Sequence, residues 1–463
     1  MVEQIPRRRH RQNRALALLV GALAALGLVV IASTAASAVP VFDGTIAVGA
    51  TPQGVAVSPD GATLYVVNQG PDTVSVIDTD TQSVTATISV GVNPILVAVS
   101  PDGGTVYVTN NGGSSVSVID AGTNTVTATI PVGVSPYGVA VSPDGATVYV
   151  ANYQDNTVSV IDTGTSTVTD TIPVGNHPLG VAVSPDGAMA YVANTDDGTV
   201  SVIDTTTNAV TAAILVGDLP HSVAVGPGGA TAYVTNRGNG TVSVVDLGTN
   251  TATTVIGTGS QPLGLAVSPD SDYVYVANVG SSRLSAIDTG TSTATPINGV
   301  PQPFGVAVAP DGSTVYVTNT STSTVSVFTE PATVPDAPTG LTATGQDRQV
   351  ELTWTAPADT GGDALIDYLI EYSGDGGITW AEYAHTPSTA TTAIVTGLVN
   401  GTVYRFHVSA INGVGTGAPS DDASATPAAP LPATGIDLTT VLLAVLLLLA
   451  TGTAFRLTAR HRG

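Results

Sequence analysis

The chain has 463 residues and a formal net charge of −23, and it contains neither cysteine nor lysine. The length allows more than one domain, the missing cysteine excludes disulfides and thiolate chemistry, and the acidic balance disfavours nucleic acid and anionic membranes as partners. Only 10% of the residues are charged, whereas glycine, threonine, valine and serine are abundant, a composition typical of strands and tight turns.

Residues 1–38 have the three parts of a secretory signal peptide in order. Five arginines fall within the first 14 residues, an apolar run follows over 15–32, and Ala36-Ser37-Ala38 is a small-residue site. This order predicts export, with the Sec route favoured, and cleavage after Ala38. The alternative is an N-terminal membrane anchor, which the alanine- and glycine-rich run and the small residues Ala36 and Ala38 disfavour.

Residues 39–329 form a repeat array. Ser-Pro-Asp-Gly, or a degenerate form of it, and Tyr-Val-x-Asn each recur seven times at a spacing of 41 or 42 residues. Each unit contains four short β-rich segments separated by turn sequences such as Pro-Asp-Gly. A period in the forties is typical of a propeller or a solenoid. Four strands in each of seven units predict an all-β fold with a seven-bladed β-propeller.

The first fragment of the array distinguishes the two architectures. The sequence TIAVG at 45–49 is the fourth segment of a unit whose first three segments do not precede it, and the seventh unit stops after three segments, at Phe328. We therefore expect a strand over 42–49 to complete the last blade and close the ring, which removes two open sheet edges. A solenoid would need caps instead of a divided repeat.

With these Tyr-Val-x-Asn markers, residues 39–329 resemble the YVTN family of β-propeller repeat proteins, found in surface-layer and secreted proteins of bacteria and archaea. Relatives by fold include propeller lactonases and amine-dehydrogenase subunits. We interpret the tyrosine and asparagine of each marker as structural residues that pack between blades and cap a turn.

The propeller is poor in residues suited to catalysis. Between 39 and 328 there is no Glu, Lys or Cys, and the aspartates of the Pro-Asp-Gly and Val-Ile-Asp sequences recur from blade to blade, which favours a scaffold role. We predict no catalytic residue, no cofactor and no metal, although a paired-carboxylate or Asp/His site in the central channel stays open. The doublet Asp196-Asp197 could contact Ca²⁺, but a solvated loop is favoured. The only histidines and arginines of the propeller are His177, His221, Arg237 and Arg283.

The connections into the inner strands vary between blades. They approximate Gly-x-x-Pro-x-Gly-Val, and we expect the residue after each proline to lie on the connection and to contribute to a ring at one mouth of the channel. This mostly apolar ring could bind a small ligand or a peptide; the alternative is that it only plugs the channel. The ring residues are Gln53, Ile95, Tyr137, Leu179, His221, Leu263 and Phe304.

Residues 330–427 resemble a fibronectin type III domain. Trp354 falls at the core tryptophan of the second strand, and Leu398 and Tyr404 match the leucine and tyrosine of the corner in that sandwich. The resemblance implies a second β-sandwich that acts as a spacer or an accessory adhesive module. It carries no Arg-Gly-Asp sequence, so integrin binding is not implied.

Residues 428–463 comprise a Pro/Ala-rich linker and a segment that resembles the LPxTG cell-wall sorting signal of Gram-positive surface proteins. An apolar run over 438–455, long enough to span a membrane, and three arginines follow the pentapeptide. The resemblance implies that a sortase cleaves after the pentapeptide threonine and joins it to peptidoglycan; the alternative is a plain membrane anchor. The pentapeptide is Leu431, Pro432, Ala433, Thr434 and Gly435.

Two functional classes remain. The favoured one is a secreted, wall-anchored, non-catalytic module for display, adhesion or protein interaction, with an unidentified extracellular protein or glycan as partner. Because pilus subunits are usually joined through lysine, the absence of lysine favours a single displayed monomer. The alternative is an extracellular, lactonase-like hydrolase with its site in the central channel, which the scarcity of Glu, His, Lys and Cys disfavours.

Overall fold

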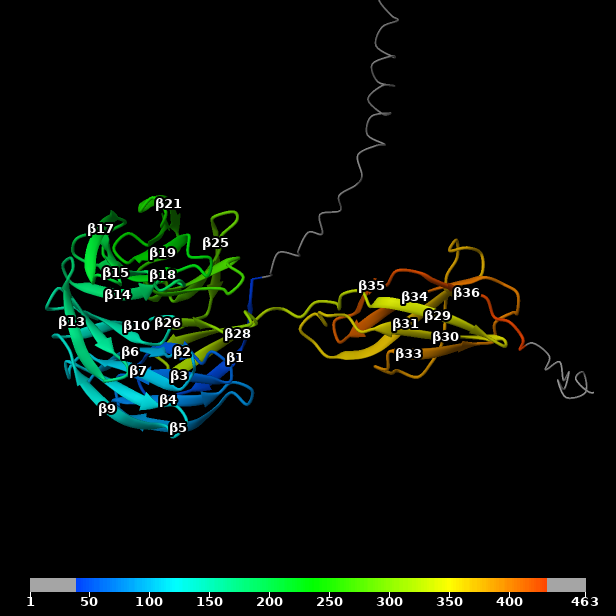
Figure 1. Cartoon of the computed structure of the whole chain (residues 1–463), viewed down its shortest axis with the longest axis horizontal. Coiled ribbons are helices and arrows are strands. Elements are labelled where there is room, and N and C mark those ends of the chain that lie inside the picture. The colour runs from blue at the N-terminus through cyan, green and yellow to red at the C-terminus, as the bar shows by residue number, and fades with distance from the viewer. Residues whose placement is uncertain (1–38, 431–463) are drawn as a thin grey trace, which may run out of the picture. The chain divides into compact units, whose positions relative to one another are not determined.

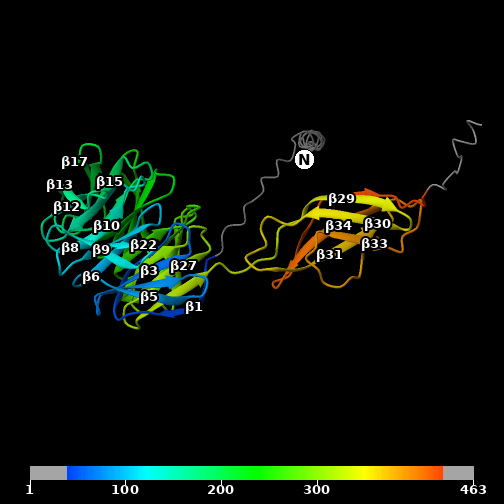
Figure 2. The same cartoon turned by 60° about the horizontal axis from the view of Figure 1, so that its bottom comes forward.

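The computed structural model describes residues 39–430, so the predicted signal peptide, sorting signal and C-terminal span lie outside the described residues. These residues form two compact units that divide between Glu330 and Pro331 (Figures 1 and 2). Apart from one 3-10 turn, η1 (Val279–Ser281), their regular structure consists of strands, which confirms the all-β prediction. No helix within 39–430 is long and apolar enough to cross a membrane.

The first unit is a seven-bladed β-propeller, as its repeats predict. Within residues 39–330, seven antiparallel sheets have four strands each. The first strand of each sheet contacts the first strand of the next, and the last of these returns to the first, so the seven inner strands form a circle (Figure 1).

The strands of the propeller follow one order along the chain. Blades 1 to 3 are β2 (Pro52–Val57), β3 (Thr63–Asn68), β4 (Thr73–Asp78), β5 (Ser83–Ser89); β6 (Pro94–Val99), β7 (Thr105–Asn110), β8 (Ser115–Asp120), β9 (Thr125–Pro131); β10 (Pro136–Val141), β11 (Thr147–Asn152), β12 (Thr157–Asp162), β13 (Thr167–Pro173). Blades 4 and 5 are β14 (Pro178–Val183), β15 (Met189–Asn194), β16 (Thr199–Asp204), β17 (Ala209–Leu215); β18 (Pro220–Val225), β19 (Thr231–Asn236), β20 (Thr241–Asp246), β21 (Thr251–Gly257). Blades 6 and 7 are β22 (Pro262–Val267), β23 (Tyr273–Asn278), β24 (Arg283–Asp288), β25 (Thr293–Asn298); β26 (Pro303–Val308), β27 (Thr314–Asn319), β28 (Thr324–Thr329) and β1 (Val41–Ala47).

The core of the propeller lies between neighbouring blades. The two middle strands of a blade are buried on both faces, as in β3, where five of six residues are buried. One cluster joins Tyr65 and Val76 of blade 1 to Val106 and Ile119 of blade 2. Such β-branched and aromatic side chains suit a pleated surface that is covered on both sides.

The repeated polar residues stabilise the blades. The marker asparagine is buried, and its side-chain amide donates to a serine on the next strand, as Asn194 does to Ser201 at 2.9 Å. Asp78 accepts hydrogen bonds from the backbone and hydroxyl of Thr81, which lower the pKa of the Asp78 carboxyl. Gly61 of the Pro-Asp-Gly turn has a φ of 77°, a conformation that favours glycine. These contacts support the structural interpretation of the repeated residues.

The ring is closed by a strand from the start of the described chain. β1 pairs antiparallel with β28, from Val41 opposite Thr329 to Ala47 opposite Thr324, with an irregularity near Phe42. Ile46 is buried among blade 7 residues and Leu64 of blade 1. The fourth strand of blade 7 thus comes from the opposite end of the propeller sequence.

The second unit is a β-sandwich of the fibronectin type III kind. One sheet has the order β29-β30-β33, and the other has β32-β31-β34-β35, with β36 also paired to β34. Trp354 packs edge-on against Tyr368, and the Tyr404 hydroxyl accepts a hydrogen bond from the Val399 backbone at 3.2 Å. The strands are β29 (Thr339–Gln346), β30 (Gln349–Thr355), β31 (Leu365–Ser373), β32 (Ala381–Glu382), β33 (Thr392–Thr396), β34 (Tyr404–Asn412), β35 (Thr416–Pro419) and β36 (Ala423–Ala425).

Candidate functional site

The seven ring residues lie at equivalent places in the seven inner strands. Each is the second residue of its strand and follows the proline with which that strand begins, so the expectation that they lie on the connections is wrong. The reason is the pairing at the proline: Pro52 already pairs with Asn68, and a register irregularity separates this pair from the one at Val55. The ring residue lies inside that irregularity and is part of the strand.

Three ring residues from different blades meet at the centre. The Tyr137 hydroxyl of blade 3 lies 3.0 Å from Nε2 of His221 in blade 5, and their rings pack edge to face. Phe304 of blade 7 packs edge-on against the same imidazole, with ring centroids 6.1 Å apart. Blades 3, 5 and 7 are not neighbours, so these contacts cross the middle of the ring.

The other ring residues surround this contact and are buried. Gln53 turns toward its own blade, where its amide donates to Gln69 at 3.2 Å. The buried members of the ring are Gln53, Ile95, Leu179, His221 and Leu263, whereas Tyr137 and Phe304 are half-buried. This packing favours the interpretation of the ring as a plug.

The titratable groups of the ring are held neutral. Burial, together with the smaller effect of the positive charge of Arg237, lowers the pKa of His221 to about 3. Burial also raises the pKa of the Tyr137 hydroxyl well above its ordinary value. Both groups are therefore uncharged at neutral pH and hydrogen-bonded to each other.

The doublet Asp196-Asp197 is engaged by neighbouring side chains. Asp196 accepts from Nδ1 of His177 at 2.6 Å, and the His177 ring stacks on Tyr153. Asp197 accepts from both the backbone and the side chain of Asn176, at 2.7 and 2.8 Å. This arrangement supports the loop interpretation. Within 39–430, no three His, Cys, Asp or Glu residues are grouped as a metal would require.

A pocket of about 820 Å³ lies where the loops of blades 5 and 6 meet. Its lining includes both arginines of the propeller, Arg237 on the loop after β19 and Arg283 at the start of β24, together with Thr258, Ser260 and Gln261. The sequence prediction does not identify this pocket. Comparison of the repeats could have found it, because Arg283 stands where the other blades have serine or threonine.

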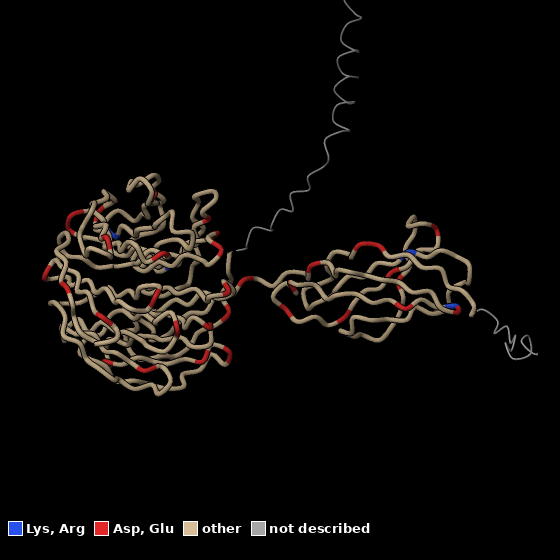
Figure 3. The backbone as a smooth tube through the Cα atoms, in the orientation of Figure 1, with Lys and Arg blue, Asp and Glu red and all other residues tan. Residues whose placement is uncertain are grey.

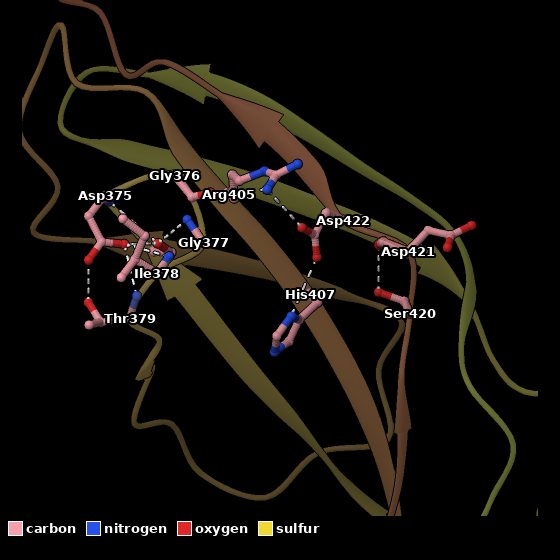
Figure 4. A network of polar contacts seen from close by, with 11 residues as sticks. Asp375, Gly376, Gly377, Ile378, Thr379, Arg405, His407, Ser420, Asp421 and Asp422 are labelled. Carbon is pink, nitrogen blue, oxygen red and sulfur yellow. Dashed lines mark hydrogen bonds and ion pairs between the residues drawn. The ribbon is translucent and has the colours of Figure 1, made fainter. Parts of the chain in front are cut away.

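The sandwich has a polar cluster of its own on the β31–β34 sheet. Arg405 and His407 both approach Asp422, at 3.6 and 3.5 Å (Figure 4). His407 also lies 2.9 Å from Glu371, and its ring stacks on Trp380. These contacts attach the segment between β35 and β36 to β34, so the cluster has a structural role in this domain.

Family models match segments of both units. Residues 336–426 match the fibronectin type III domain. Residues 41–133, 77–174 and 126–214 match the lactonase seven-bladed β-propeller, and residues 222–328 match the YNCE-like β-propeller.

Curated relatives match a short part of the chain. A titin homolog of Caenorhabditis elegans is 42% identical over 94 residues, which are 20% of this chain and round to 0% of that protein. Human myomesin-2 is 34% identical over 19% of this chain and 6% of its own length. The chicken cell adhesion molecule DSCAM is 34% identical over 18% of this chain and 4% of its own length. The chain thus spans less than a tenth of the length of the curated relatives it matches.

One solved structure with a similar fold is Kuenenia stuttgartiensis hydrazine synthase. The similarity covers 60% of this chain and 95% of that chain, with 27% identity and a TM-score of 0.56. Together with the family matches, it supports the assignment of the larger unit. The chain therefore combines a β-propeller, similar to the lactonase and YNCE-like propeller models, with a fibronectin type III domain.

Proposed function

We propose that this chain is a secreted protein that a sortase joins to peptidoglycan, and that it acts on the Gram-positive cell surface as a non-catalytic display, adhesion or protein-interaction module. The order of its segments supports this: a signal-like N-terminus, two β domains, and the pentapeptide at 431–435 before an apolar run and a basic tail. Its partner would be an extracellular protein or a glycan.

The contact between Tyr137 and His221 carries the non-catalytic part of the proposal. A hydrolase needs a titratable group that can reach substrate and water. Here the channel imidazole is 5% exposed, neutral and hydrogen-bonded to the tyrosine hydroxyl. The channel centre is thus built as packing, and binding falls to the loops and to the fibronectin type III domain, a domain type that also occurs in a cell adhesion molecule.

Partner capture tests this proposal. The purified full chain is screened against cells, glycan arrays and extracellular proteins, and two variants are then compared on each partner found. If the sandwich binds, deletion of 330–427 abolishes capture; if the propeller loops bind, capture survives that deletion. Tyr137→Ala with Phe304→Ala should leave capture unchanged in a folded chain, and loss of capture would show that the ring itself binds. Because the ring residues belong to strands, thermal unfolding of the double variant is measured first. A chain that captures nothing and turns over a substrate would refute the proposal.

A second candidate is a lactonase-like hydrolase. The observation in its favour is the match of residues 41–214 to the lactonase propeller model. It requires the channel to open, because Tyr137 and His221 block its centre. Hydrolysis of a panel of lactones by the full chain, lost in the His221→Gln variant, would favour this candidate over the first.

A further inference from the structure

The junction of blades 5 and 6 holds the two arginines of the propeller, and neither forms an ion pair within the described residues, although Asp218 lies beside the loop of Arg237. Within 39–430, no carboxylate oxygen lies within 4.0 Å of a guanidinium nitrogen of Arg237 or Arg283. Acidic residues are spread over the rest of the propeller, where residues 39–330 contain no other arginine and no lysine (Figure 3). Two guanidinium groups that form no ion pair and line the same pocket are suited to binding an anion.

Arg283 replaces a hydroxyl residue that stabilises the other blades. At the equivalent position the marker asparagine donates to the hydroxyl, as Asn194 does to Thr199 at 3.0 Å. The Arg283 side chain cannot accept this bond, so the Asn278 amide donates to the Arg283 backbone carbonyl at 3.4 Å, and Nη2 of Arg283 donates to the Thr258 carbonyl at 2.5 Å. Blade 6 thus lacks a repeated structural contact and presents a guanidinium to the pocket. The equivalent residues, each paired in register with a marker asparagine, are Thr73, Ser115, Thr157, Thr199, Thr241 and Thr324.

This junction lacks the acids that the two preceding blades carry three residues after the marker asparagine, as do blades 1, 2 and 7. At this position, blades 3 and 4 have Asp155 and Asp197, whose carboxylates accept backbone hydrogen bonds at 2.6 and 2.7 Å. Blades 5 and 6 have Asn239 and Ser281 at that position. The Ser281 hydroxyl still accepts such a bond, from the Ser260 backbone at 3.2 Å. The backbone contact is therefore kept in blade 6 while the negative charge is absent.

The pocket also has room and polar lining groups. Gly257, the last residue of β21, borders open space, because a Cβ atom added to it would have no atom within 4 Å. The equivalent residues of blades 3 and 4 are the larger Pro173 and Leu215. The volume of about 820 Å³ is in the range of small-molecule sites. Asn239 and Gln261 supply side-chain amides that can bond to ligand hydroxyl groups.

We propose that this pocket binds the carboxylate of an acidic sugar, a uronic acid unit of an extracellular glycan. The two guanidinium groups bind the carboxylate, and the amide and hydroxyl side chains bind the sugar hydroxyls. A dense polyanion is disfavoured because the acidic propeller repels it, whereas a single negative charge is not. The inference rests on the proposed function as a non-catalytic binding module and specifies the class of its glycan partner.

Isothermal titration of the purified full chain tests the ligand class. The probes are D-glucuronate and D-galacturonate, with D-glucose as the neutral control and inorganic phosphate as the competing anion. We expect saturable binding of at least one uronate, at least tenfold tighter than glucose and phosphate, and weaker at high salt. Equal binding of glucose, preference for phosphate, or no uronate binding would overturn the proposal.

Four variants test the site itself. Arg283→Thr restores the residue of the other blades, so it should fold, and Asn239→Asp restores the acid of blades 3 and 4; each should raise the Kd for uronate at least tenfold. Arg237→Gln should do the same. Arg348→Gln, which removes an exposed charge in the sandwich, should leave the Kd unchanged. Uronate binding that withstands all three pocket substitutions places the site elsewhere and refutes the assignment.

The two proposals fail in different ways. If the chain captures a cell-surface partner but binds no uronate, the pocket assignment is wrong and the display function stands. If uronate binds to the pocket but the protein is not retained on the wall, the anchoring is wrong and the pocket assignment stands.

Discussion

The hydroxyl of Tyr137 and Nε2 of His221 lie 3.0 Å apart, although the two residues belong to blades 3 and 5. They are 84 positions apart in the chain, two repeats of 42 residues, so the circular arrangement of the blades brings them together. The contact closes the centre of the propeller with two neutral polar groups. A ligand or substrate could therefore reach the channel centre only if this contact opened.

The burial of His221 predicts a pH dependence of stability. Its folded pKa is about 3, against about 6.5 in the unfolded chain. Between these values the unfolded chain binds more protons, so this residue destabilises the fold as the pH falls below about 6.5. From pH 7 to pH 4 we expect a loss of about 3 kcal/mol that His221→Gln does not show.

Denaturant unfolding at the two pH values measures this difference. His177→Gln is the matched control, because it removes a histidine whose side chain is 38% exposed. If His221→Gln and the wild type lose stability in parallel, the imidazole is not held neutral in the channel.

Closure of the ring by β1 predicts unequal effects within that strand. Ile46 is 3% exposed and packs against both blade 7 and blade 1, so Ile46→Ala should cost about 2–4 kcal/mol. Val41 is 50% exposed, and Val41→Ala should cost less than about 0.5 kcal/mol. Deletion of 39–49 should cost more than either substitution, because β28 loses its paired strand. Thermal unfolding compares the three; equal midpoints for the deletion and the wild type would show that β1 does not stabilise the ring.

Each buried marker asparagine should contribute to the stability of its blade. Asn194 is buried and donates to Thr199 and Ser201, so Asn194→Ala should cost about 1–3 kcal/mol by leaving the serine hydroxyl unpaired. A double-mutant cycle with Ser201→Ala isolates the contact, and we expect the second substitution to cost little once the first is present. Strictly additive losses would mean that the two side chains do not interact.

Much of the fold could be predicted from the sequence because the repeats are regular. The spacing of Tyr-Val-x-Asn predicts seven blades, and the isolated fourth segment at 45–49 predicts the pairing of β1 with β28. Trp354 and Tyr404 identify the sandwich, because the tryptophan occupies a fixed position in the core of this domain type and the tyrosine a fixed position at its corner. These features are local patterns with a single geometric solution.

The candidate sites were less predictable, because side-chain contacts across the ring depend on geometry that no single repeat contains. The sequence suggests a ring of residues on connections, whereas the irregularity after Pro52 and its equivalents places them in strands. Whether Tyr137 reaches His221 depends on the ring diameter and on both side-chain directions. The arginine pocket depends on what blades 5 and 6 lack, and a pattern of missing residues is visible only when the repeats are aligned.

Cell fractionation of the wild-type protein and of Thr434→Ala tests surface display by sortase anchoring. We expect detergent to leave wild-type protein with the cell wall and muramidase to release it. We expect Thr434→Ala to appear in the medium or in the detergent-soluble membrane fraction, because the substitution alters the pentapeptide that the sortase would recognise. Wild-type protein that detergent alone dissolves, or a Thr434→Ala variant that still needs muramidase for release, would show that a sortase does not anchor this chain.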